Sequence, residues 1–228
     1  MDIFIWCVFI IGGFLFGSIM FSQIITKAVT KKDICSESDD GNPGAFNTFK
    51  LCGVKWGSLC VFLEMLKGFL PVLLAQLLWR PEHWLMAFVV AAPVLGHALG
   101  IFNRFRGGKC IAVSGGAFAG LVPFSYVVFI YIGLYLFFSL VVKIKPNILR
   151  SIIVFSLQLV GSVMMCILMK TPYIAIGSAA ICVIALIKHL IPLKSEMAKY
   201  RAQKIAEKQK AAPSASEEAS DVSDNTEA

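Results

Sequence analysis

A short cationic segment interrupts one of the most apolar regions of the chain, and its residue types suit the binding of an anion. It covers residues 103–110 and reads Asn-Arg-Phe-Arg-Gly-Gly-Lys-Cys. Arg106 offers a planar fork to phosphate oxygens, and Lys109 adds a point charge. Gly107 and Gly108 let backbone N–H groups approach an anion at the expected start of a membrane helix, which carries positive partial charge. The segment therefore predicts a phosphate site, although a loop that is basic only because it faces the cytoplasm would look the same.

Glu64, Lys67 and His97 are ionisable residues inside apolar runs, where a charge costs roughly 2.5–3.5 kcal/mol at a helix centre. Glu64 and Lys67 are three residues apart, which places them on one helix face, and we expect them to neutralise each other. They either form a self-contained ion pair or line a polar cavity. His97 lies just before residues 103–110, which favours a role near the predicted phosphate over that of a structural histidine.

A second candidate binding segment lies in the first polar stretch, between residues 38 and 50. Asparagine amides suit neutral hydroxyl groups, and a lysine suits a phosphate. An ordinary loop with turn-forming residues is the alternative. The candidate residues of this segment are Gly41, Asn42, Gly44, Asn47 and Lys50.

The composition requires a membrane around these segments. Of the 228 residues, 57% are hydrophobic and 15% are charged, and the mean hydropathy is +0.76. A soluble domain carries roughly 25% charged residues and could not bury this much apolar surface. The seven cysteines show no CxxC or Cys/His metal spacing, so we expect no cofactor and treat them as small apolar side chains or thiols. We expect membrane lipid to surround the protein, and we expect no nucleic-acid partner.

The apolar runs predict an all-α polytopic membrane protein with seven transmembrane helices, the N-terminus outside and the C-terminus cytoplasmic. This orientation places nearly all lysines and arginines on the cytoplasmic side. Counting residues 111–142 as one span would instead place Lys143, Lys145 and Arg150 outside, so we divide this run near Val122–Pro123 into a short span and a full one. The other runs cover residues 3–25, 56–79, 84–102, 148–169 and 173–193.

The two ends of the chain have contrasting character. The first run lacks a positive leading region and a cleavage site, so we interpret it as a retained span and not as a signal peptide. Residues 211–228 are polar and acidic and lack aromatic residues, while residues 194–210 carry mixed charges and could form a frayed helix. We therefore expect a membrane domain over residues 1–193 and a cytoplasmic, charged and largely disordered tail over residues 194–228.

The candidate segments resemble, in order, the motifs of bacterial membrane acyltransferases of the PlsY type, which use acyl phosphate to acylate glycerol 3-phosphate. Residues 96–112 are similar to the motif G-H-x-x-P-x-x-x-x-F-K/R-G-G-K-G-x-A, with Gly100 for proline and Cys110 for glycine. Residues 64–72 are similar to D-x-x-K-G-x-x-P-V, with Glu64 for aspartate.

The first and third family motifs are matched with more departures. Residues 39–50 resemble G-S-G-N-x-G-A-T-N-x-x-R, with Asp40, Phe46 and Lys50 where the family has serine, threonine and arginine. Residues 187–197 keep Lys188–His189 and, loosely, Glu196 of the third motif, but not its asparagine.

The resemblance implies acyl transfer from acyl phosphate to the 1-hydroxyl of glycerol 3-phosphate, which makes lysophosphatidate for phospholipid synthesis. It implies a multi-pass protein of a bacterial plasma membrane whose active site faces the cytoplasm, with His97 as a catalytic residue that orients or polarises a substrate oxygen. No Ser–His–Asp or Cys–His set suggests a covalent acyl-enzyme, and a good leaving group reduces the need for a strong base. The implied substrate-binding residues are Gly41, Asn42, Gly44, Asn47, Lys50, Lys67, Arg106, Gly107, Gly108, Lys109 and His189.

Two other functions stay open at this point. The departures at Asp40, Phe46 and residues 187–197 fit a protein of the same fold with an altered or lost acyl acceptor. Glu64, Lys67 and the glycine-rich helices would also fit a small-solute transporter, although the chain shows no inverted repeat.

Overall fold

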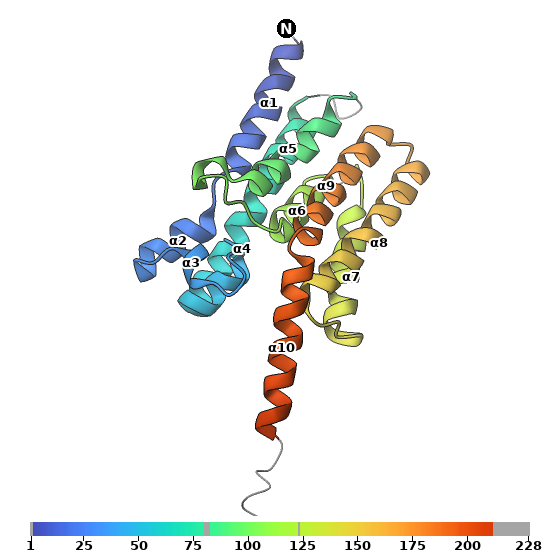
Figure 1. The fold of residues 1–228 in the computed structure, drawn as a ribbon. Helices are drawn as coiled ribbons and strands as arrows, with labels where there is room; N and C mark the ends of the chain where they lie inside the picture. Colours follow the sequence, from blue (N-terminus) through green and yellow to red (C-terminus); the bar gives the residue numbers. More distant parts are fainter. Residues whose placement is uncertain (1, 80–82, 123, 212–228) are drawn as a thin grey trace, which may run out of the picture. The chain divides into compact units, whose positions relative to one another are not determined.

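The computed structural model describes residues 2–79, 83–122 and 124–211, and the regular structure within them is helical (Figure 1). The chain divides into two compact units, Met1–Ile191 and Pro192–Ala228. Among the described residues, five helical stretches are long and apolar enough to cross a membrane: Ile3–Thr30, Ala45–Leu78, Met86–Asn103, Asn147–Leu168 and Pro172–Leu190. The prediction of an all-α membrane protein is confirmed at this level.

The first apolar run is interrupted where the sequence suggests one continuous helix. α1 covers Asp2–Gly17 and α2 covers Phe21–Thr30, so residues 18–20 break the expected helix. A Cβ on Gly17 would collide with the backbone of Pro93, which shows how closely the end of α1 approaches its neighbour. Because the helix stops here, the Ile19 carbonyl can accept a hydrogen bond from outside the helix.

The polar stretch of residues 26–55, between the first two expected spans, is largely helical. α2 continues to Thr30, the short α3 covers Ile34–Glu37, and the long α4 covers Ala45–Leu78. Gly53, with a φ of 81°, interrupts the helical geometry inside α4. The expected span of residues 56–79 is thus the later part of a longer helix whose first turns carry Asn47 and Lys50.

The cationic segment precedes a helix and does not form its first turn, contrary to the sequence-based expectation. α5 covers Met86–Leu99 and ends at Gly100, which has a φ of 58° and donates its N–H to the Gly96 carbonyl at 2.7 Å. A proline, as in the family motif, could adopt neither this φ nor this hydrogen bond. The 3₁₀ turn Ile101–Asn103 follows, residues 106–110 have no regular structure, and α6 covers Ile111–Ala119.

The long apolar run of residues 111–142 is divided, as predicted. α6 ends at Ala119, and the next helix, α7, covers Val127–Leu136 and continues as a π-helical turn, Phe137–Val141. The predicted break at Val122–Pro123 falls between these helices, and Pro123 itself lies outside the described residues. α8 (Asn147–Leu168) and α9 (Pro172–Leu190) complete the first unit.

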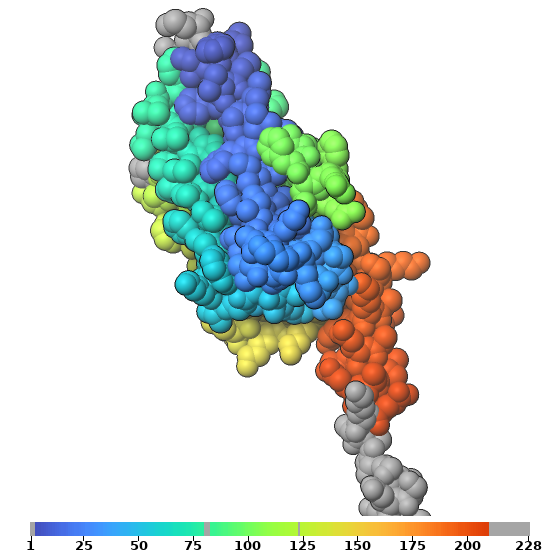
Figure 2. Space-filling model, turned by 90° about the vertical axis from the view of Figure 1, so that its left-hand side faces the viewer, coloured from blue at the N-terminus to red at the C-terminus, as the bar shows by residue number. Residues whose placement is uncertain are grey.

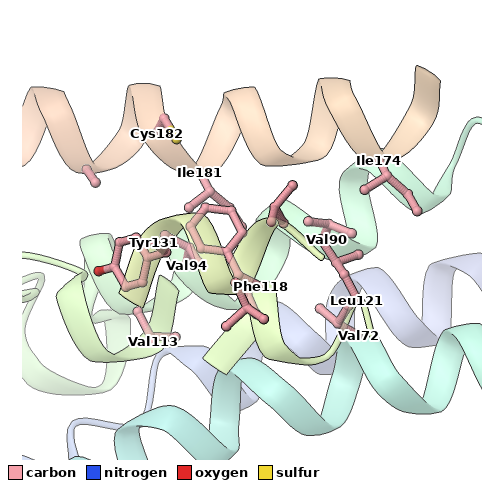
Figure 3. Close-up of a cluster of buried hydrophobic side chains, with 14 of the residues drawn as sticks. Val72, Val90, Val94, Val113, Phe118, Leu121, Tyr131, Ile174, Ile181 and Cys182 are labelled. Carbon is pink, nitrogen blue, oxygen red and sulfur yellow. The ribbon is translucent and has the colours of Figure 1, made fainter. Parts of the chain in front are cut away.

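The short helix α6 lies inside the first unit and contacts α4, α5, α7 and α9. Figure 3 shows Phe118 of α6 among buried side chains that include Val90 of α5, Tyr131 of α7 and Ile181 of α9. α4 and α6 approach so closely that a Cβ on Gly116 would collide with the backbone of Met65. This contact holds Glu64 and Lys67 of α4 beside the helix that follows the cationic segment.

The second unit contains α10, which covers Leu193–Ala211. Residues 194–211 of the expected tail are therefore helical. The remaining part, residues 212–228, lies outside the described residues, so its predicted disorder stays a prediction.

Candidate functional site

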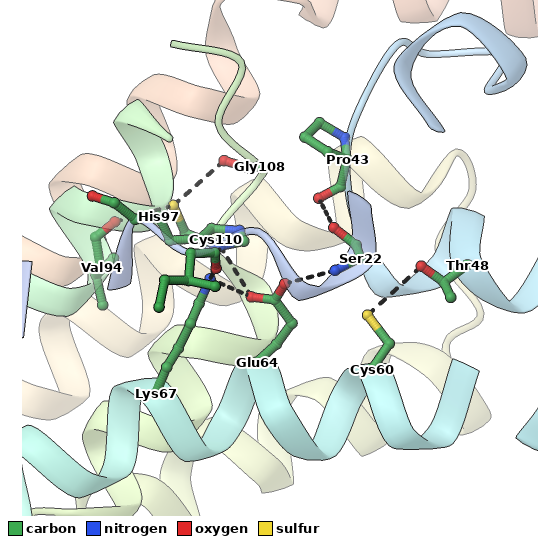
Figure 4. Close-up of polar contacts among 12 residues, drawn as sticks. Ser22, Pro43, Thr48, Cys60, Glu64, Lys67, Val94, His97, Gly108 and Cys110 are labelled. Carbon is green, nitrogen blue, oxygen red and sulfur yellow. Dashed lines mark hydrogen bonds and ion pairs between the residues drawn. The ribbon is translucent and has the colours of Figure 1, made fainter. Parts of the chain in front are cut away.

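A buried cluster of three ionisable side chains joins α4 to α5 (Figure 4). Lys67 Nζ lies 2.6 Å from Glu64 Oε2 and 2.9 Å from His97 Nδ1, and the same His97 nitrogen lies 3.1 Å from Glu64 Oε2. All three residues are 5% exposed or less. The prediction that Glu64 and Lys67 neutralise each other is confirmed, and the structure adds His97 to the pair.

The break between α1 and α2 completes this cluster. Lys67 Nζ donates to the Ile19 carbonyl at 2.5 Å, and the backbone N–H of Ser22, in the first turn of α2, donates to Glu64 Oε1 at 3.3 Å. The Lys67 ammonium thus makes hydrogen bonds with Ile19 O and His97 Nδ1 and an ion pair with Glu64 Oε2. The positive end of α2 adds to the stabilisation of the buried carboxylate.

A second, partly exposed cluster connects the two candidate binding segments. Lys109 Nζ lies 2.8 Å from Asp40 Oδ2, and the side-chain amide of Asn47 donates to Asp40 Oδ1 at 2.8 Å. The same amide donates to the backbone carbonyl of Asn42 at 2.8 Å, and the Asn42 N–H donates to Asp40 Oδ1 at 3.2 Å. Asp40 therefore organises residues 40–47 and holds them against Lys109.

The Asp40 carboxylate is stabilised by these contacts. Burial alone would raise the pKa of Asp40, but the Lys109 ammonium and the N–H donors of Asn47 and Asn42 hold this pKa below its ordinary value of 3.8. Asp40 is therefore ionised at neutral pH, and it compensates much of the Lys109 charge that would otherwise act on a bound anion.

Two links join the buried cluster to the partly exposed one. Ser22, which donates its N–H to Glu64, donates its hydroxyl to the Pro43 carbonyl at 2.7 Å (Figure 4). The N–H of Gly108 donates to the His97 carbonyl at 3.1 Å. The segments of residues 40–47 and 106–110 are therefore anchored to the same elements as Glu64, Lys67 and His97.

The two glycines of the cationic segment fit against the end of α5. A Cβ on Gly107 would collide with the Ala98 carbonyl, and a Cβ on Gly108 would collide with the His97 ring at Nε2. The Gly108 N–H is already used by the protein. The glycines thus permit close packing against His97, whereas the sequence suggested direct approach of their N–H groups to an anion.

Two other predicted site residues, Lys50 and Arg106, make no contact with these clusters that the structure shows among its described residues. Two more, Gly41 and Gly44, contribute through their backbone conformation or position. Lys50 is exposed and pairs with Asp39 at 3.1 Å, and Arg106 lines a surface groove beside α2. Gly41 has a left-handed φ of 63°, and Gly44 precedes the first residue of α4.

His189 lies near the C-terminal end of α9, buried against Phe155, with ring centroids 5.8 Å apart. Its Nδ1 lies 2.8 Å from the Ala185 carbonyl. Its Nε2 has no hydrogen-bond partner among the described residues. The third motif thus contributes a histidine whose Nδ1 contacts its own helix and whose Nε2 is a candidate for contact with a ligand.

Three contributors to the site escaped the sequence analysis. Asp40 stood out only as a departure from the family serine, and the Ile19 carbonyl has no side-chain signal at all. Ser22 could have been noticed because Ser18 and Ser22 are spaced i, i+4 in an otherwise apolar run. Each acts through a contact between segments that are distant in sequence.

The comparisons with known proteins identify the family of this chain. The profile of a family described as glycerol-3-phosphate acyltransferase matches residues 7–199. The glycerol-3-phosphate acyltransferase of Bacillus velezensis is 32% identical over 185 residues, which cover 81% of this chain and 90% of the relative. That of Aquifex aeolicus is 36% identical over 127 residues, which cover 53% of this chain and 64% of the relative.

Crystal structures of PlsY (YgiH), an integral membrane glycerol 3-phosphate acyltransferase, share the fold. The glycerol 3-phosphate form has a TM-score of 0.72 and 26% identity, covering 85% of this chain and 92% of that chain. The lysophosphatidic acid form has a TM-score of 0.69 and 26% identity, covering 83% and 92%. Because the family profile spans most of the sequence and the fold agrees, this chain belongs to the glycerol-3-phosphate acyltransferase family.

Proposed function

We propose that this enzyme transfers an acyl chain from acyl phosphate to the 1-hydroxyl of glycerol 3-phosphate and so makes 1-acyl-glycerol 3-phosphate. The hydroxyl oxygen attacks the acyl carbonyl carbon, the bond from that carbon to the phosphate oxygen breaks, and the departing phosphate takes the bonding electrons and the hydroxyl proton. The observation that carries this proposal is the meeting of Lys109, Asn47 and the His97 cluster in a chain of this family. Because the chain belongs to an acyltransferase family, we favour acyl transfer over the alternative function of a small-solute transporter.

His97 is proposed to act as a hydrogen-bond donor. Its Nδ1 lies 2.9 Å from the Lys67 ammonium, which can only donate, so Nδ1 accepts and the proton resides on Nε2. The alternative, in which Nδ1 donates to Glu64 over 3.1 Å, would leave one Lys67 proton without its acceptor. An Nε2–H beside Gly108 suits the polarisation of a carbonyl or phosphate oxygen.

The other residues are assigned supporting roles. Lys109 attracts a substrate phosphate, with Asn42, Asn47 and Lys50 as candidate contacts for glycerol 3-phosphate. Lys67 is completely buried, so we assign it to the positioning of His97 and not to direct substrate contact.

The remaining candidates keep narrower proposed roles. Gly107 and Gly108 shape the wall of the site, and Gly41 and Gly44 shape residues 40–47. Arg106 and the spare Nε2 of His189 remain candidate phosphate contacts.

The proposed topology has seven spans, with the N-terminus outside and the site on the cytoplasmic face of a bacterial plasma membrane. The asymmetric distribution of lysine and arginine supports it, with α6 counted as the short span and α7 with its π-helical turn as the full one. We further propose that residues 1–193 form the membrane domain and that residues 194–228 lie in the cytoplasm. Cysteines introduced near Gly41 and Gly108 should resist an impermeant thiol reagent in intact cells, and outside labelling of either would overturn this topology.

The reaction is tested with purified protein, an acyl phosphate and labelled glycerol 3-phosphate. We expect labelled lysophosphatidate from acyl phosphate and none from a thioester donor such as acyl-CoA. Lack of product with acyl phosphate, under conditions in which a known family enzyme is active, would refute the proposal.

An altered acceptor has one specific observation in its favour, because Asp40 compensates Lys109 where the family has a neutral serine. The same assay with labelled glycerol in place of glycerol 3-phosphate tests it. Faster acylation of glycerol than of glycerol 3-phosphate would replace the proposed acceptor by an uncharged one.

The donor role of His97 has its own test. His97→Gln places an amide N–H near the position of Nε2, whereas His97→Asn places it near Nδ1. We expect His97→Gln to retain more activity than His97→Asn. The reverse order would indicate that Nδ1, and not Nε2, carries the functional proton.

A further inference from the structure

An open groove of about 650 Å³ lies between α2 and the segment that follows α5. Figure 2 shows the two walls side by side on one face of the molecule, with residues 101–108 in bright green next to α2 and α3 in blue. The groove is lined by Gln23, Ile24, Lys27, Ala28, Lys31, Asp33, Phe102, Asn103, Arg104 and Arg106. The lining contains four cations and one carboxylate.

The single carboxylate of the groove is engaged by neutral donors. Asp33 Oδ1 accepts the N–H groups of Cys35 at 2.8 Å and Ser36 at 3.2 Å, which caps the start of α3. Asp33 Oδ2 accepts the side-chain amide of Gln23 at 3.3 Å. Asp33 therefore builds the wall of the groove and forms no ion pair with its cations within the described part of the chain.

The four cations of the groove have no acidic partner among the described residues. Across residues 2–79, 83–122 and 124–211, no ion pair involves Lys27, Lys31, Arg104 or Arg106. The Lys31 ammonium donates to the Ala28 carbonyl at 3.3 Å. Lys109, three residues beyond Arg106, differs because it is held by Asp40. The groove thus concentrates more unpaired positive charge than the candidate reaction centre does.

Apolar side chains border this charge. Ile24 is 54% exposed and Phe102 is 64% exposed, and both line the groove. Ile24 and Phe102 lie near the C-terminal ends of the apolar candidate spans Ile3–Thr30 and Met86–Asn103, where we expect the membrane surface. A ligand that combines a phosphate with an acyl chain would satisfy the cations and the apolar border together.

We propose that this groove is a second phosphate site, which binds the head group of a phosphate-bearing lipid whose chain lies along Ile24 and Phe102. We treat it as distinct from the reaction centre because Asp40, Asn47, His97 and Lys109 do not line the groove. The bound molecule is a diacyl phosphatidate of the bilayer or a single-chain compound such as lysophosphatidate. The site does not depend on the proposed acyl transfer.

The test measures lipid binding without turnover. The full-length protein is placed in phosphatidylcholine nanodiscs, and binding of dioleoyl phosphatidate, oleoyl lysophosphatidate and inorganic phosphate is measured separately by native mass spectrometry. The groove variant is Lys27→Gln with Arg104→Gln. The matched control is Lys55→Gln with Lys143→Gln, two exposed cations outside the groove.

We expect the groove variant to lose roughly tenfold or more in affinity for a phosphate-headed lipid, because each basic residue near a lipid head group contributes to binding. The control variant should bind as the parent protein does. Preference for phosphatidate would identify the bilayer as the source of the ligand, and preference for lysophosphatidate would identify the single-chain class. Both results support the site.

Three results would overturn the proposal. The first is unchanged lipid binding by a folded groove variant. The second is an equal loss in the control, which would indicate general surface charge. The third is inorganic phosphate binding as tightly as the lipids, which would remove the role of the acyl chain. Failure of the acyl-transfer assay would leave these results unaffected, so the two proposals fail separately.

Discussion

Two ion pairs of this acyltransferase differ in burial and in what they connect, since Glu64 and Lys67 are neighbours within α4 whereas Asp40 and Lys109 are far apart in the sequence. Glu64 and Lys67 are almost completely buried, whereas the side chains of Asp40 and Lys109 are 22% and 17% exposed. Removing a charge from water is costly, and hydrogen bonds with Ile19, Ser22 and His97 offset part of this cost for the buried pair. The partly exposed pair can open toward a ligand at small cost. The buried cluster is therefore suited to holding His97 in position, and the partly exposed Asp40–Lys109 pair is suited to binding a substrate.

The largest effect on stability is expected for Lys67→Met, which leaves the Glu64 carboxylate buried without its cation. We expect the free energy of unfolding to fall by about 3–5 kcal/mol. Adding Glu64→Gln should restore part of this loss, since the uncompensated charge is then gone. Unfolding of the detergent-solubilised protein measures both variants, and additive losses in the double-mutant cycle would contradict the pairing.

The exposed pair should respond in activity and not in stability. Lys109→Ala should lower kcat/KM for glycerol 3-phosphate by roughly 10- to 100-fold, because a charge-assisted hydrogen bond to the substrate phosphate is lost. The free energy of unfolding should change by about 1 kcal/mol or less. Lys55→Ala, which removes an exposed cation elsewhere, serves as the control. A loss of stability comparable to that of Lys67→Met would erase the distinction between the two pairs.

The contact between the two clusters can be broken at Gly108. A methyl group at this position collides with the His97 ring, so Gly108→Ala should displace His97 and lower kcat, with a stability cost of about 1–3 kcal/mol. Gly133→Ala is the matched control, because a Cβ there meets nothing within 4 Å. Measured kcat values equal to that of the parent for both variants, with normal membrane insertion, would show that His97 does not depend on this contact.

A smaller effect is expected for Asp40→Ser, which restores the neutral residue of the family motif. The substitution removes the carboxylate that compensates Lys109, so KM for glycerol 3-phosphate should fall a few-fold while the free energy of unfolding changes by about 1 kcal/mol or less. Steady-state kinetics with the donor held constant measures this change. A rise in KM would mean that the Asp40 carboxylate itself helps to bind the acceptor.

The smallest effect is the pH dependence of the Asp40–Lys109 pair. Because the pKa of Asp40 is below its ordinary value of 3.8 in the folded protein, the pair contributes its full stability above pH 3.8. This contribution is lost as the pH falls through the lower folded value. The unfolding free energies of the parent and of Asp40→Asn should therefore run in parallel from about pH 8 to 5 and converge only in acid. Convergence near neutral pH would contradict the direction of the pKa shift.

The sequence alone determined those features that depend on composition and on short spacing. Apolar runs predicted a helical membrane protein, and the i, i+3 spacing of Glu64 and Lys67 predicted their ion pair, because helix geometry brings such neighbours together. The residue pattern around Gly107 and Gly108 was specific enough to indicate the acyltransferase family. Helix boundaries were less certain, since residues 26–55 are polar and yet largely helical.

Only the tertiary structure decided how the site is assembled. Asp40 and Lys109 are 69 residues apart, and Lys67 reaches the Ile19 carbonyl over 48 residues, so no local spacing could have revealed either contact. The collision at Gly108 depends on the position of the His97 ring, and the groove depends on the packing of α2 beside residues 102–106. The physical reason is the same in each case. Charges and carbonyl groups acquire their partners from whatever segment the packed helices bring within hydrogen-bonding distance, and that proximity is a property of the fold.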